Sequence, residues 1–233
     1  MRLQVFLSHN GVCSRREALK VIQSGVVTVN GQLIVEPSFN VSEADKISVN
    51  GKDVSAKKYA YILLNKPQGY VTSKESQFGQ RTVLDLLPKD LHYVAPVGRL
   101  DKDTEGLLLL TNDGQWLHQL THPKFDVDKK YFVRIDGVLT GPEQKNLEKG
   151  VEIEGKRTAP CKITELKALG NKSEFCITIH EGKKRQIRLM LEKAGHRVTY
   201  LLRMQQGPLK LGDLPRGQWR FLNEEEIAKL RNV

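Results

Sequence analysis

The amino-acid sequence predicts an α+β protein with a small domain over residues 1–55 and a larger domain over residues 59–233. The polar segment 51–58 has no hydrophobic periodicity, which is typical of a linker between two domains. Beyond it, strand-like and helix-like segments interleave without the regular spacing of βαβ units. We therefore expect the larger domain to contain a mixed, mostly antiparallel sheet flanked by helices. At 233 residues the chain is long enough to bury a sizeable core.

The small domain is predicted to combine helices with a β-hairpin. Apolar residues recur at helical spacing over residues 3–24. Ser14 and Glu17 have the spacing of a capping box, which predicts a helix that starts at Ser14 and ends before Gly25. An Asn-Gly pair at residues 30–31 lies between two β-rich runs and predicts a two-residue hairpin turn.

The larger domain begins with a predicted strand at residues 59–64 and a turn at residues 65–69. Local patterns predict further helices at residues 115–120, 142–150, 187–194 and from Asn223 onward, and strands at residues 107–111, 130–135, 151–153, 159–166 and 175–180. Arg188 lies near the apolar stripe of one of these helices. Because that helix is expected to pack on the sheet that carries Asp101, Arg188 should be partly buried and should need a carboxylate partner.

The stretch GRLDKDTEGLLLLTNDG at residues 98–114 combines acids with a core strand. Its leucine run is bounded by turn residues and predicts a strand buried on both faces. Asp101, Asp103 and Glu105 are then expected in a loop at the mouth of this strand, where a rigid scaffold positions accessible side chains. A solvated loop would show the same charges, and the spacing also resembles the start of a calcium loop. That calcium loop would need a bidentate glutamate at its twelfth position, which is Asn112 here.

The composition indicates a polyanionic partner. A formal net charge of +10 and an isoelectric point near 9.5 favour nucleic acid, with an anionic membrane surface as the alternative. No apolar run approaches the roughly 20 residues of a membrane-spanning helix, and the first residues lack a signal-peptide layout, so we expect a cytoplasmic protein. No glycine-rich nucleotide-binding motif occurs, and we expect no metal or nucleotide cofactor. Three widely spaced cysteines are expected to be reduced: Cys13, Cys161 and Cys176.

Five further motifs accompany the stretch at residues 98–114. They are LNKPQGYV at 64–71, THP at 121–123, KKYFV at 129–133, HEGKKRQIRLM at 180–190 and GPLKLGDLPRGQWRFL at 207–222. In this order they resemble the motifs of the bacterial ribosomal RNA pseudouridine synthases of the RsuA type. The N-terminal segment in addition resembles an S4 RNA-binding domain, whose helical face binds structured RNA. The resemblance covers nearly the whole chain.

The resemblance implies an isomerase that converts one uridine of ribosomal RNA to pseudouridine. This reaction breaks the C1′–N1 glycosidic bond, rotates the freed uracil and rejoins it through C5, without redox change, phosphate transfer or an energy source. By match to the family motifs, Asp101 is the catalytic carboxylate. Tyr131 matches the tyrosine that stacks on the target base and takes part in removing the C5 proton. Arg188 matches the basic residue that pairs with the catalytic aspartate.

RNA contacts are expected from basic residues of both domains. In the small domain they lie on the first turns of the helix that starts at Ser14: Arg15, Arg16 and Lys20. In the larger domain they lie near the motifs: Lys66, Arg99, Lys102, Lys183, Lys184 and Arg185. Lys66 is expected in an exposed turn, where it could contact a phosphate. The alternative for each of these residues is a solvated surface charge.

A function of a different class is that of a non-catalytic S4-domain factor, which binds RNA or assists ribosome assembly. Such a factor would need neither the acid loop nor Tyr131, and this chain has both. The tail and the stretch EGKKRQIR look more similar to the large-subunit members of the family, so 23S rRNA is expected as the substrate before 16S rRNA. We expect a monomer that acts on ribosomal RNA, either free or in an assembling subunit, and that has no membrane partner.

Overall fold

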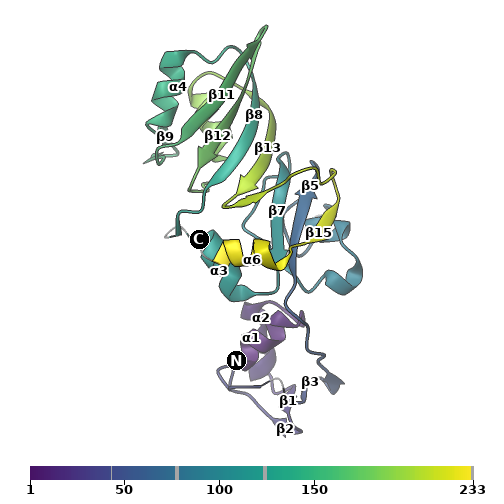
Figure 1. The fold of residues 1–233 in the computed structure, drawn as a ribbon. Helices are drawn as coiled ribbons and strands as arrows, with labels where there is room; N and C mark the ends of the chain where they lie inside the picture. Colours follow the sequence, from purple (N-terminus) through teal and green to yellow (C-terminus); the bar gives the residue numbers. More distant parts are fainter. Residues whose placement is uncertain (43, 77–78, 123–124, 232–233) are drawn as a thin grey trace.

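The computed structural model describes residues 1–42, 44–76, 79–122 and 125–231 (Figure 1). Its N-terminal part packs two helices, α1 (Leu3–His9) and α2 (Arg15–Gln23), against a four-stranded sheet of order β2-β1-β3-β4. The strands are β1 (Val27–Val29), β2 (Gln32–Leu33), β3 (Ile47–Val49) and β4 (Lys52–Asp53). The predicted capping box is present, because Ser14 N–H donates to the Glu17 carboxylate at 2.8 Å and Glu17 N–H donates to Ser14 Oγ at 3.3 Å. This part has an apolar cluster of its own: Leu3, Phe6, Leu7, Ala18, Ile22, Val27, Val29, Ile34, Val41 and Ile47.

Two Asn-Gly pairs form the hairpin turns of the small sheet. Asn30 and Gly31 have φ values of 52° and 82°, and Asn50 and Gly51 have φ values of 51° and 73°, as type I′ turns require. The first turn confirms the sequence prediction. The second turn corrects it, because the chain turns back into β4 instead of starting a linker at residue 51. The irregular connection to the larger part comprises residues 54–60.

The larger part is built on one mixed sheet of order β11-β12-β8-β13-β7-β5-β15, and β14 and β6 pair at its sides. Among the described strands, β7 and β13 form the one parallel pair, so the sheet is mostly antiparallel and the predicted α+β class is confirmed. The strands are β5 (Tyr61–Lys66), β6 (Ala95–Val97), β7 (Glu105–Thr111), β8 (Lys129–Asp136), β11 (Lys162–Leu169), β12 (Lys172–Ile179), β13 (Val198–Gln206), β14 (Leu209–Lys210) and β15 (Trp219–Phe221). A small separate hairpin pairs β9 (Glu152–Ile153) with β10 (Lys156–Arg157).

Helices cover both faces of this sheet. One face carries α4 (Gly141–Glu148), α5 (Gln186–Lys193) and the short 3₁₀ helices η1 (Val83–Leu86) and η2 (Lys89–Leu91); the other face carries α3 (Gly114–Thr121) and α6 (Glu224–Arg231). In β7, Leu108 and Leu110 pack in the apolar cluster on the face covered by α4 and α5. Leu107 and Leu109 pack in the cluster on the face covered by α3 and α6. All four leucines are fully buried, which confirms the predicted strand with two buried faces.

The parallel contact between β7 and β13 is short. The two registered residue pairs are Leu202 with Glu105 and Arg203 with Gly106. Gly106 has a φ of 103°, and a Cβ atom there would lie 2.3 Å from the Arg203 carbonyl oxygen, so this close approach requires glycine. The contact joins one half of the sheet, with β11, β12, β8 and β13, to the other half, with β7, β5 and β15 (Figure 1).

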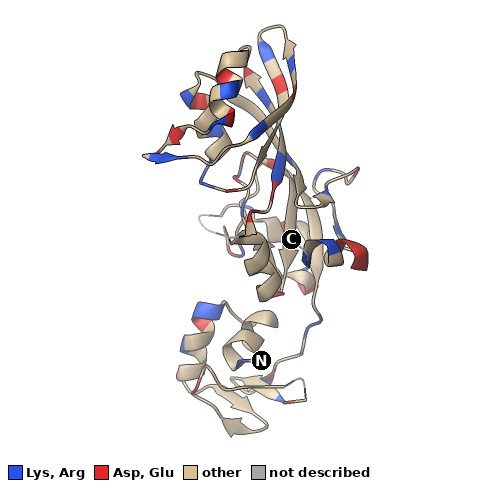
Figure 2. Cartoon of the chain, turned by 60° about the vertical axis from the view of Figure 1, so that its left-hand side comes forward, with Lys and Arg blue, Asp and Glu red and all other residues tan. Residues whose placement is uncertain are grey.

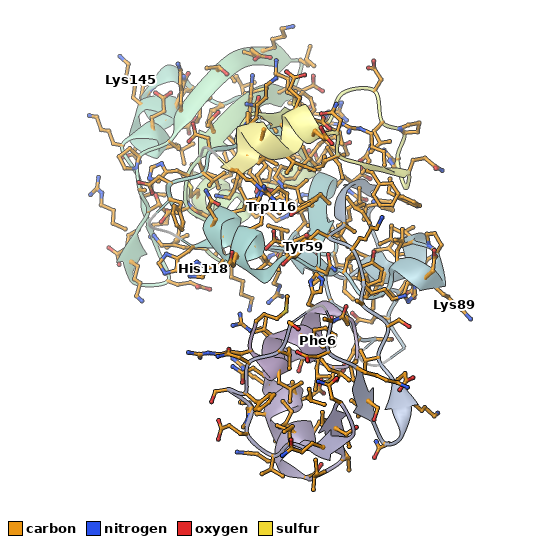
Figure 3. All side chains as sticks on the ribbon, turned by 60° about the horizontal axis from the view of Figure 1, so that its bottom comes forward. Phe6, Tyr59, Lys89, Trp116, His118 and Lys145 are labelled. Atoms are coloured by element: carbon orange, nitrogen blue, oxygen red, sulfur yellow. The ribbon has the colours of Figure 1, made fainter. Side chains whose placement is uncertain are left out.

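A joint around His9 and Asn112 connects the N-terminal part to the larger part. His9 Nδ1 lies 3.1 Å from the Asn112 carbonyl oxygen, and the Asn112 side-chain amide donates to the carbonyl oxygens of His9 at 3.3 Å and Lys58 at 3.1 Å. The Tyr59 ring packs edge-on against the His9 ring, with centroids 4.6 Å apart. In Figure 3, Tyr59 lies between the N-terminal part, which contains Phe6, and the body of the larger part.

Candidate active site

A cleft of about 430 Å³ lies between the loop that precedes β7 and the strands β8, β12 and β13. Its apolar residues are Leu100, Tyr131, Ile179, Ile187 and Leu201, and its charged residues are Arg99, Asp101, Lys183, Lys184 and Arg185. The structure thus brings together most of the residues that the sequence predicts for catalysis. An apolar floor beneath a basic rim suits a flat ring attached to an anionic chain.

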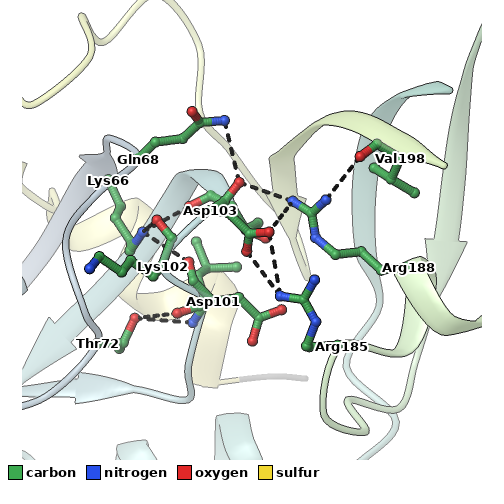
Figure 4. A network of polar contacts seen from close by, with 11 residues as sticks. Lys66, Gln68, Thr72, Asp101, Lys102, Asp103, Arg185, Arg188 and Val198 are labelled. Atoms are coloured by element: carbon green, nitrogen blue, oxygen red, sulfur yellow. Dashed lines mark hydrogen bonds and ion pairs between the residues drawn. The ribbon is translucent and has the colours of Figure 1, made fainter. Parts of the chain in front are cut away.

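Asp101 presents a free carboxylate to this cleft. No described residue donates a hydrogen bond to its side chain, whereas its backbone carbonyl accepts from Lys66 Nζ at 3.0 Å and from Thr104 N–H at 3.1 Å. The side chain is half-buried, and Figure 4 shows the carboxylate on the side of the loop where Arg185 lies. The backbone of Asp101 is therefore fixed while its carboxylate oxygens are available to a ligand.

The loop around Asp101 is held at each of its carbonyl groups from residue 100 to residue 104. Residues 66–72 supply most of the donors (Figure 4). Thr72 Oγ1 donates to Leu100 O at 2.7 Å, and Lys66 Nζ donates to Asp101 O at 3.0 Å and to Thr104 O at 2.8 Å. Gly69 N–H donates to Lys102 O at 2.8 Å, and Gln68 Nε2 donates to Asp103 O at 3.3 Å. The LNKPQGYV motif and the threonine that follows it thus form a clamp on the loop.

Lys66 corrects the prediction of an exposed RNA contact. It is the last residue of β5 and has no exposed surface, and its ammonium group also donates to the Pro67 carbonyl oxygen at 3.1 Å. Burial lowers the pKa of Lys66 to about 8, against the opposing effect of nearby acids, of which Asp103 is the strongest. Because the ammonium group is enclosed by the carbonyl oxygens of the loop, it cannot reach a phosphate outside.

The two arginines at the start of α5 contact Asp103 instead of Asp101. Arg188 Nη2 lies 3.3 Å from Asp103 Oδ2 and donates to the Asp103 carbonyl oxygen at 3.0 Å. Arg185 Nη1 lies 3.3 Å from Asp103 Oδ1. The Arg188 side chain is 12% exposed, so the expected burial and the need for a carboxylate are confirmed. The expected pairing with Asp101 is corrected, because Asp103 faces α5 while Asp101 faces the cleft.

Local backbone geometry places Arg185 over the cleft. Arg185 caps α5 with a φ of 51°, a conformation that is uncommon for residues other than glycine. The buried Gln186 side chain holds the loop before it, since it accepts from Lys183 N–H at 3.0 Å and donates to Glu181 at 2.6 Å. The strained residue is therefore supported on its N-terminal side by a neighbouring hydrogen-bond network.

Glu105 corrects the prediction of three acids in one loop. It is the first residue of β7 and is 3% exposed. Its carboxylate accepts a hydrogen bond from the Tyr200 hydroxyl at 2.9 Å and lies 3.1 Å from Arg216 Nη2. Burial, followed by this hydrogen bond, raises the pKa of Tyr200. The three acids thus separate into Asp101 in the cleft, Asp103 beside two arginines, and Glu105 in the interior.

Tyr131 is both a core residue and a lining residue of the cleft. It lies in β8, is 8% exposed and belongs to the apolar cluster that also contains Leu100 and Ile187. Its hydroxyl group has no hydrogen-bond partner among the described residues. The ring is therefore fixed by packing, and its polar end is free.

The remaining basic candidates lie in two parts of the fold, at the cleft of the larger part and on α2 of the N-terminal part. Figure 2 shows Lys and Arg in blue in both parts. Arg99 and Lys184 are exposed at the cleft, and Lys102 is exposed on the same loop. Lys183 already has an anionic partner, because its Nζ lies 3.0 Å from Glu181. A second surface lies on α2, where three side chains are exposed and have no ion-pair partner among the described residues: Arg15, Arg16 and Lys20.

Among the described residues we find no metal site, disulfide bond or membrane-spanning helix. They contain no group of three or more His, Cys, Asp or Glu side chains that could hold a metal ion. The three cysteines are free. None of the helices in the described part of the chain combines the length and apolar character of a membrane span. Pro123 of the THP motif lies outside the described residues.

Two family profiles match the sequence. The RNA pseudouridylate synthase profile matches residues 60–193, and the S4 domain profile matches residues 1–47. The chain belongs to the RNA pseudouridylate synthase family. The chain is thus an RNA-modifying isomerase, and the alternative of a non-catalytic S4-domain factor is set aside.

Relatives match this synthase over nearly its whole length. The ribosomal large subunit pseudouridine synthase B of Bacillus subtilis is 40% identical over 233 residues, which cover 99% of this chain and 95% of that protein. The ribosomal small subunit pseudouridine synthase A of Vibrio cholerae is 35% identical and covers 99% of both chains. A crystal structure of a pseudouridylate synthase matches with a TM-score of 0.71 and 31% identity over 99% of both chains. The predicted fold, an S4 domain followed by a pseudouridine synthase domain, is confirmed.

Proposed function

We propose that this synthase converts a uridine of ribosomal RNA to pseudouridine in the cleft beside Asp101. The proposal rests on the Asp101 carboxylate, which has no hydrogen-bond partner among the described residues and which a clamped loop holds at a basic cleft that Tyr131 also lines. Relatives named for the ribosomal large subunit and the ribosomal small subunit support ribosomal RNA as the substrate.

The reaction exchanges one bond of the ribose C1′ atom for another. The C1′–N1 bond breaks, the C1′–C5 bond forms, the hydrogen on C5 leaves as a proton, and N1 gains a proton, so the product is an isomer. While the glycosidic bond is broken, positive charge develops at C1′, and a fixed anion beside that atom stabilises the transition state. Asp101 supplies this anion, because its carboxylate oxygens are free of protein donors among the described residues.

Tyr131 and the arginines have separate tasks in this proposal. The Tyr131 ring forms part of the apolar floor, where stacking is worth about 1–3 kcal/mol per base and holds the detached uracil. Its free hydroxyl group takes part in removal of the C5 proton. Arg188 acts through Asp103, because its guanidinium group binds that residue. This contact fixes the loop two residues after Asp101. Arg185 lies at the cleft and orients the ribose-phosphate chain.

Binding and chemistry are divided between two domains. Residues 1–55 dock on folded ribosomal RNA through the basic face of α2, and residues 59–233 carry out the isomerisation. Arg99, Lys102 and Lys184 contact phosphates around the target uridine. We propose that the synthase acts as a monomer, because the residues assigned to catalysis all line or support a cleft within one chain. We propose a cytoplasmic location, because ribosomal RNA is the proposed substrate.

The variant Asp101→Asn tests the catalytic assignment, since it keeps the side-chain size and removes the charge. Ribosomal RNA transcripts labelled with tritium at uridine C5 should release tritium with the wild type and none above background with Asp101→Asn, while RNA binding is retained. The exposed acid Asp90 on η2 provides a control, and Asp90→Asn should remain active. Turnover near that of the wild type in Asp101→Asn would remove Asp101 from its role.

Both 23S and 16S transcripts belong in this experiment. We propose 23S rRNA as the substrate, because the tail GPLKLGDLPRGQWR and the stretch EGKKRQIR look more similar to large-subunit members of the family. Tritium release from the 16S transcript alone would reverse this choice and leave the isomerase activity itself established.

A further inference from the structure

A second groove, of about 460 Å³, lies beside the catalytic cleft. Arg99, Leu100 and Asp101 line both cavities, so the Asp101 loop forms the ridge between them. Figure 4 shows Thr72, which lines the second groove, and Arg185, which lines the cleft, on opposite sides of Asp101. A ligand that reaches Asp101 from the cleft can therefore continue over the ridge into the second groove.

The groove has the polar groups that a nucleotide requires. Arg99 and Lys102 lie on its ridge side, and their side chains are exposed and have no hydrogen-bond or ion-pair partner among the described residues. Gln80 and the exposed acid Glu75 also line the groove; the Gln80 side chain is exposed and its amide is likewise unpaired within the described part of the chain. The backbone at Gln80 is held in place, because its carbonyl oxygen accepts from Ser76 Oγ at 2.8 Å. The groove thus combines free cations with an amide that can both donate and accept.

The groove lies on the side of the cleft that faces the N-terminal domain. Lys74 follows the lining residue Ser73 and is close enough to Glu17 of α2 to interact with its charge. Tyr93 of the larger domain packs directly on Gly11, just before α2. The segment that lines the groove is therefore close to α2, the helix that carries the exposed basic residues.

We propose that this groove is a subsite for the nucleotide adjacent to the modified uridine, and that Gln80 recognises the base of that nucleotide. The proposal rests on the assignment of RNA as the substrate of the Asp101 cleft. Arg99 and Lys102 bind the phosphate groups on either side of the ridge. The Gln80 amide pairs with one donor and one acceptor on the edge of an unstacked base, as side-chain amides do in sequence-specific contacts. A substrate uridine is then selected together with one of its neighbours.

The test measures how the neighbouring bases affect modification. A short RNA that contains the uridine modified in ribosomal RNA transcripts is made with random nucleotides on both sides of that uridine. The pool is treated with the full-length wild type and with Gln80→Ala, and pseudouridine is mapped by sequencing. We expect the wild type to prefer one base at one of the two positions by about 10-fold or more, as for a bidentate contact, and Gln80→Ala to abolish this preference.

Two controls separate this proposal from the assigned activity. Gln115→Ala removes another exposed glutamine, on α3, and should keep the wild-type preference. Thermal unfolding of Gln80→Ala should match that of the wild type, because the side chain makes no hydrogen bond to a described residue. A wild type that is active without any neighbour preference, or a Gln80→Ala variant that keeps the preference, would overturn the subsite. If the wild type instead modifies no uridine in the 23S and 16S transcripts themselves, the assignment of ribosomal RNA as the substrate is overturned.

Discussion

Lys66 stabilises the loop around Asp101 from the interior of the protein. Its ammonium group is enclosed by the carbonyl oxygens of Pro67, Asp101 and Thr104 at 3.1, 3.0 and 2.8 Å. Burying a cation costs free energy unless its hydrogens find acceptors. Here these three carbonyl groups accept the three hydrogens, and the Lys102 carbonyl oxygen lies farther away at 3.5 Å. The position of Asp101 therefore depends on a residue that has no exposed surface.

We expect Lys66→Met to change the pH dependence of stability. The pKa of Lys66 is about 8 in the folded protein and 10.5 in the unfolded chain. Between these values the unfolded chain binds more protons than the folded protein, so the contribution of Lys66 to the free energy of unfolding increases with pH. This contribution is complete above 10.5 and is lost as the pH falls through 8. Urea denaturation across this window should show the increase in the wild type and a smaller one in Lys66→Met.

Exposed Lys20 supplies the control for this comparison, and Lys20→Met should keep the wild-type pH dependence. Burial also lowers the pKa of Lys129 to about 8. Because Lys129 is present in both proteins, its contribution to the pH dependence cancels when the two profiles are subtracted. Turnover of Lys66→Met should also fall, because the loop loses its hydrogen bonds. Identical pH profiles for the wild type and Lys66→Met would show that Lys66 does not titrate in this window.

Residue roles that depend on long-range contacts could not be predicted from the sequence. The pattern Asn-Lys-Pro-Gln-Gly is typical of an exposed turn, but β5 continues through Lys66 because this residue pairs with Gly106 of β7. The acids at residues 101 and 103 are equivalent in the local sequence, and only the packing of α5 decides that Asp103 meets Arg188. Tyr131 was predicted to stack on the target base, and the packing of β8 makes it a core residue as well as a lining residue of the cleft.

Among the elements, α2 presents three cations on an exposed face. If these side chains contact phosphates, changing Arg15, Arg16 and Lys20 together to Gln should weaken RNA binding. The slope of log affinity against log salt concentration should fall by roughly one unit per contact removed. Filter-binding titrations at several salt concentrations measure this slope, and single-turnover rates on saturating RNA should be nearly unchanged.

A matched triple variant controls for net charge. Lys162, Lys167 and Lys172 are exposed on β11 and β12, remote in the fold from α2, and their change to Gln removes the same charge. This variant should keep most of the wild-type salt slope. Equal slopes for the α2 variant and the wild type would mean that the α2 cations are solvated in the complex.

Elements with strong local signals were predictable from the sequence. The capping box identifies the start of α2, the Asn30-Gly31 pair identifies the first hairpin, and the leucine run identifies β7. The strand β13 was not predicted, although it lies in the middle of the sheet. It contains buried Arg203 and Gln206, so its polar residues mask the pattern of a core strand. Its Arg203 Nε donates to the Leu107 carbonyl oxygen at 2.7 Å, a contact that only the folded sheet reveals.

At the scale of the whole molecule, Asn112 connects the two domains. Its side chain donates to the carbonyl oxygens of His9 and Lys58 and accepts from Ala60 N–H at 2.9 Å. We expect Asn112→Ala to loosen the N-terminal domain, because these three hydrogen bonds are lost. Limited proteolysis should then cut the connection at residues 54–60 faster than in the wild type. Affinity for ribosomal RNA should fall, while the rate on a saturating short RNA should change little.

Asn223→Ala serves as the comparison, since it removes a helix cap at α6 and leaves the domain joint intact. Its connection at residues 54–60 should be cut at the wild-type rate. An Asn112→Ala protein that is as resistant as the wild type would show that the contacts of His9 and Tyr59 suffice to hold the domains together.

The short contact between β7 and β13 gives the sheet a mechanical property. Bending concentrates at the row with the fewest hydrogen bonds, and this row contains two registered residue pairs. Asp101 is attached to one side of it and Tyr131 to the other. We therefore expect a small rotation about this line to change the distance between Asp101 and Tyr131, and with it the width of the cleft. The contacts of Asp103 with the two arginines, and of Glu105 with Tyr200, cross the same line and hold the two halves of the sheet together there.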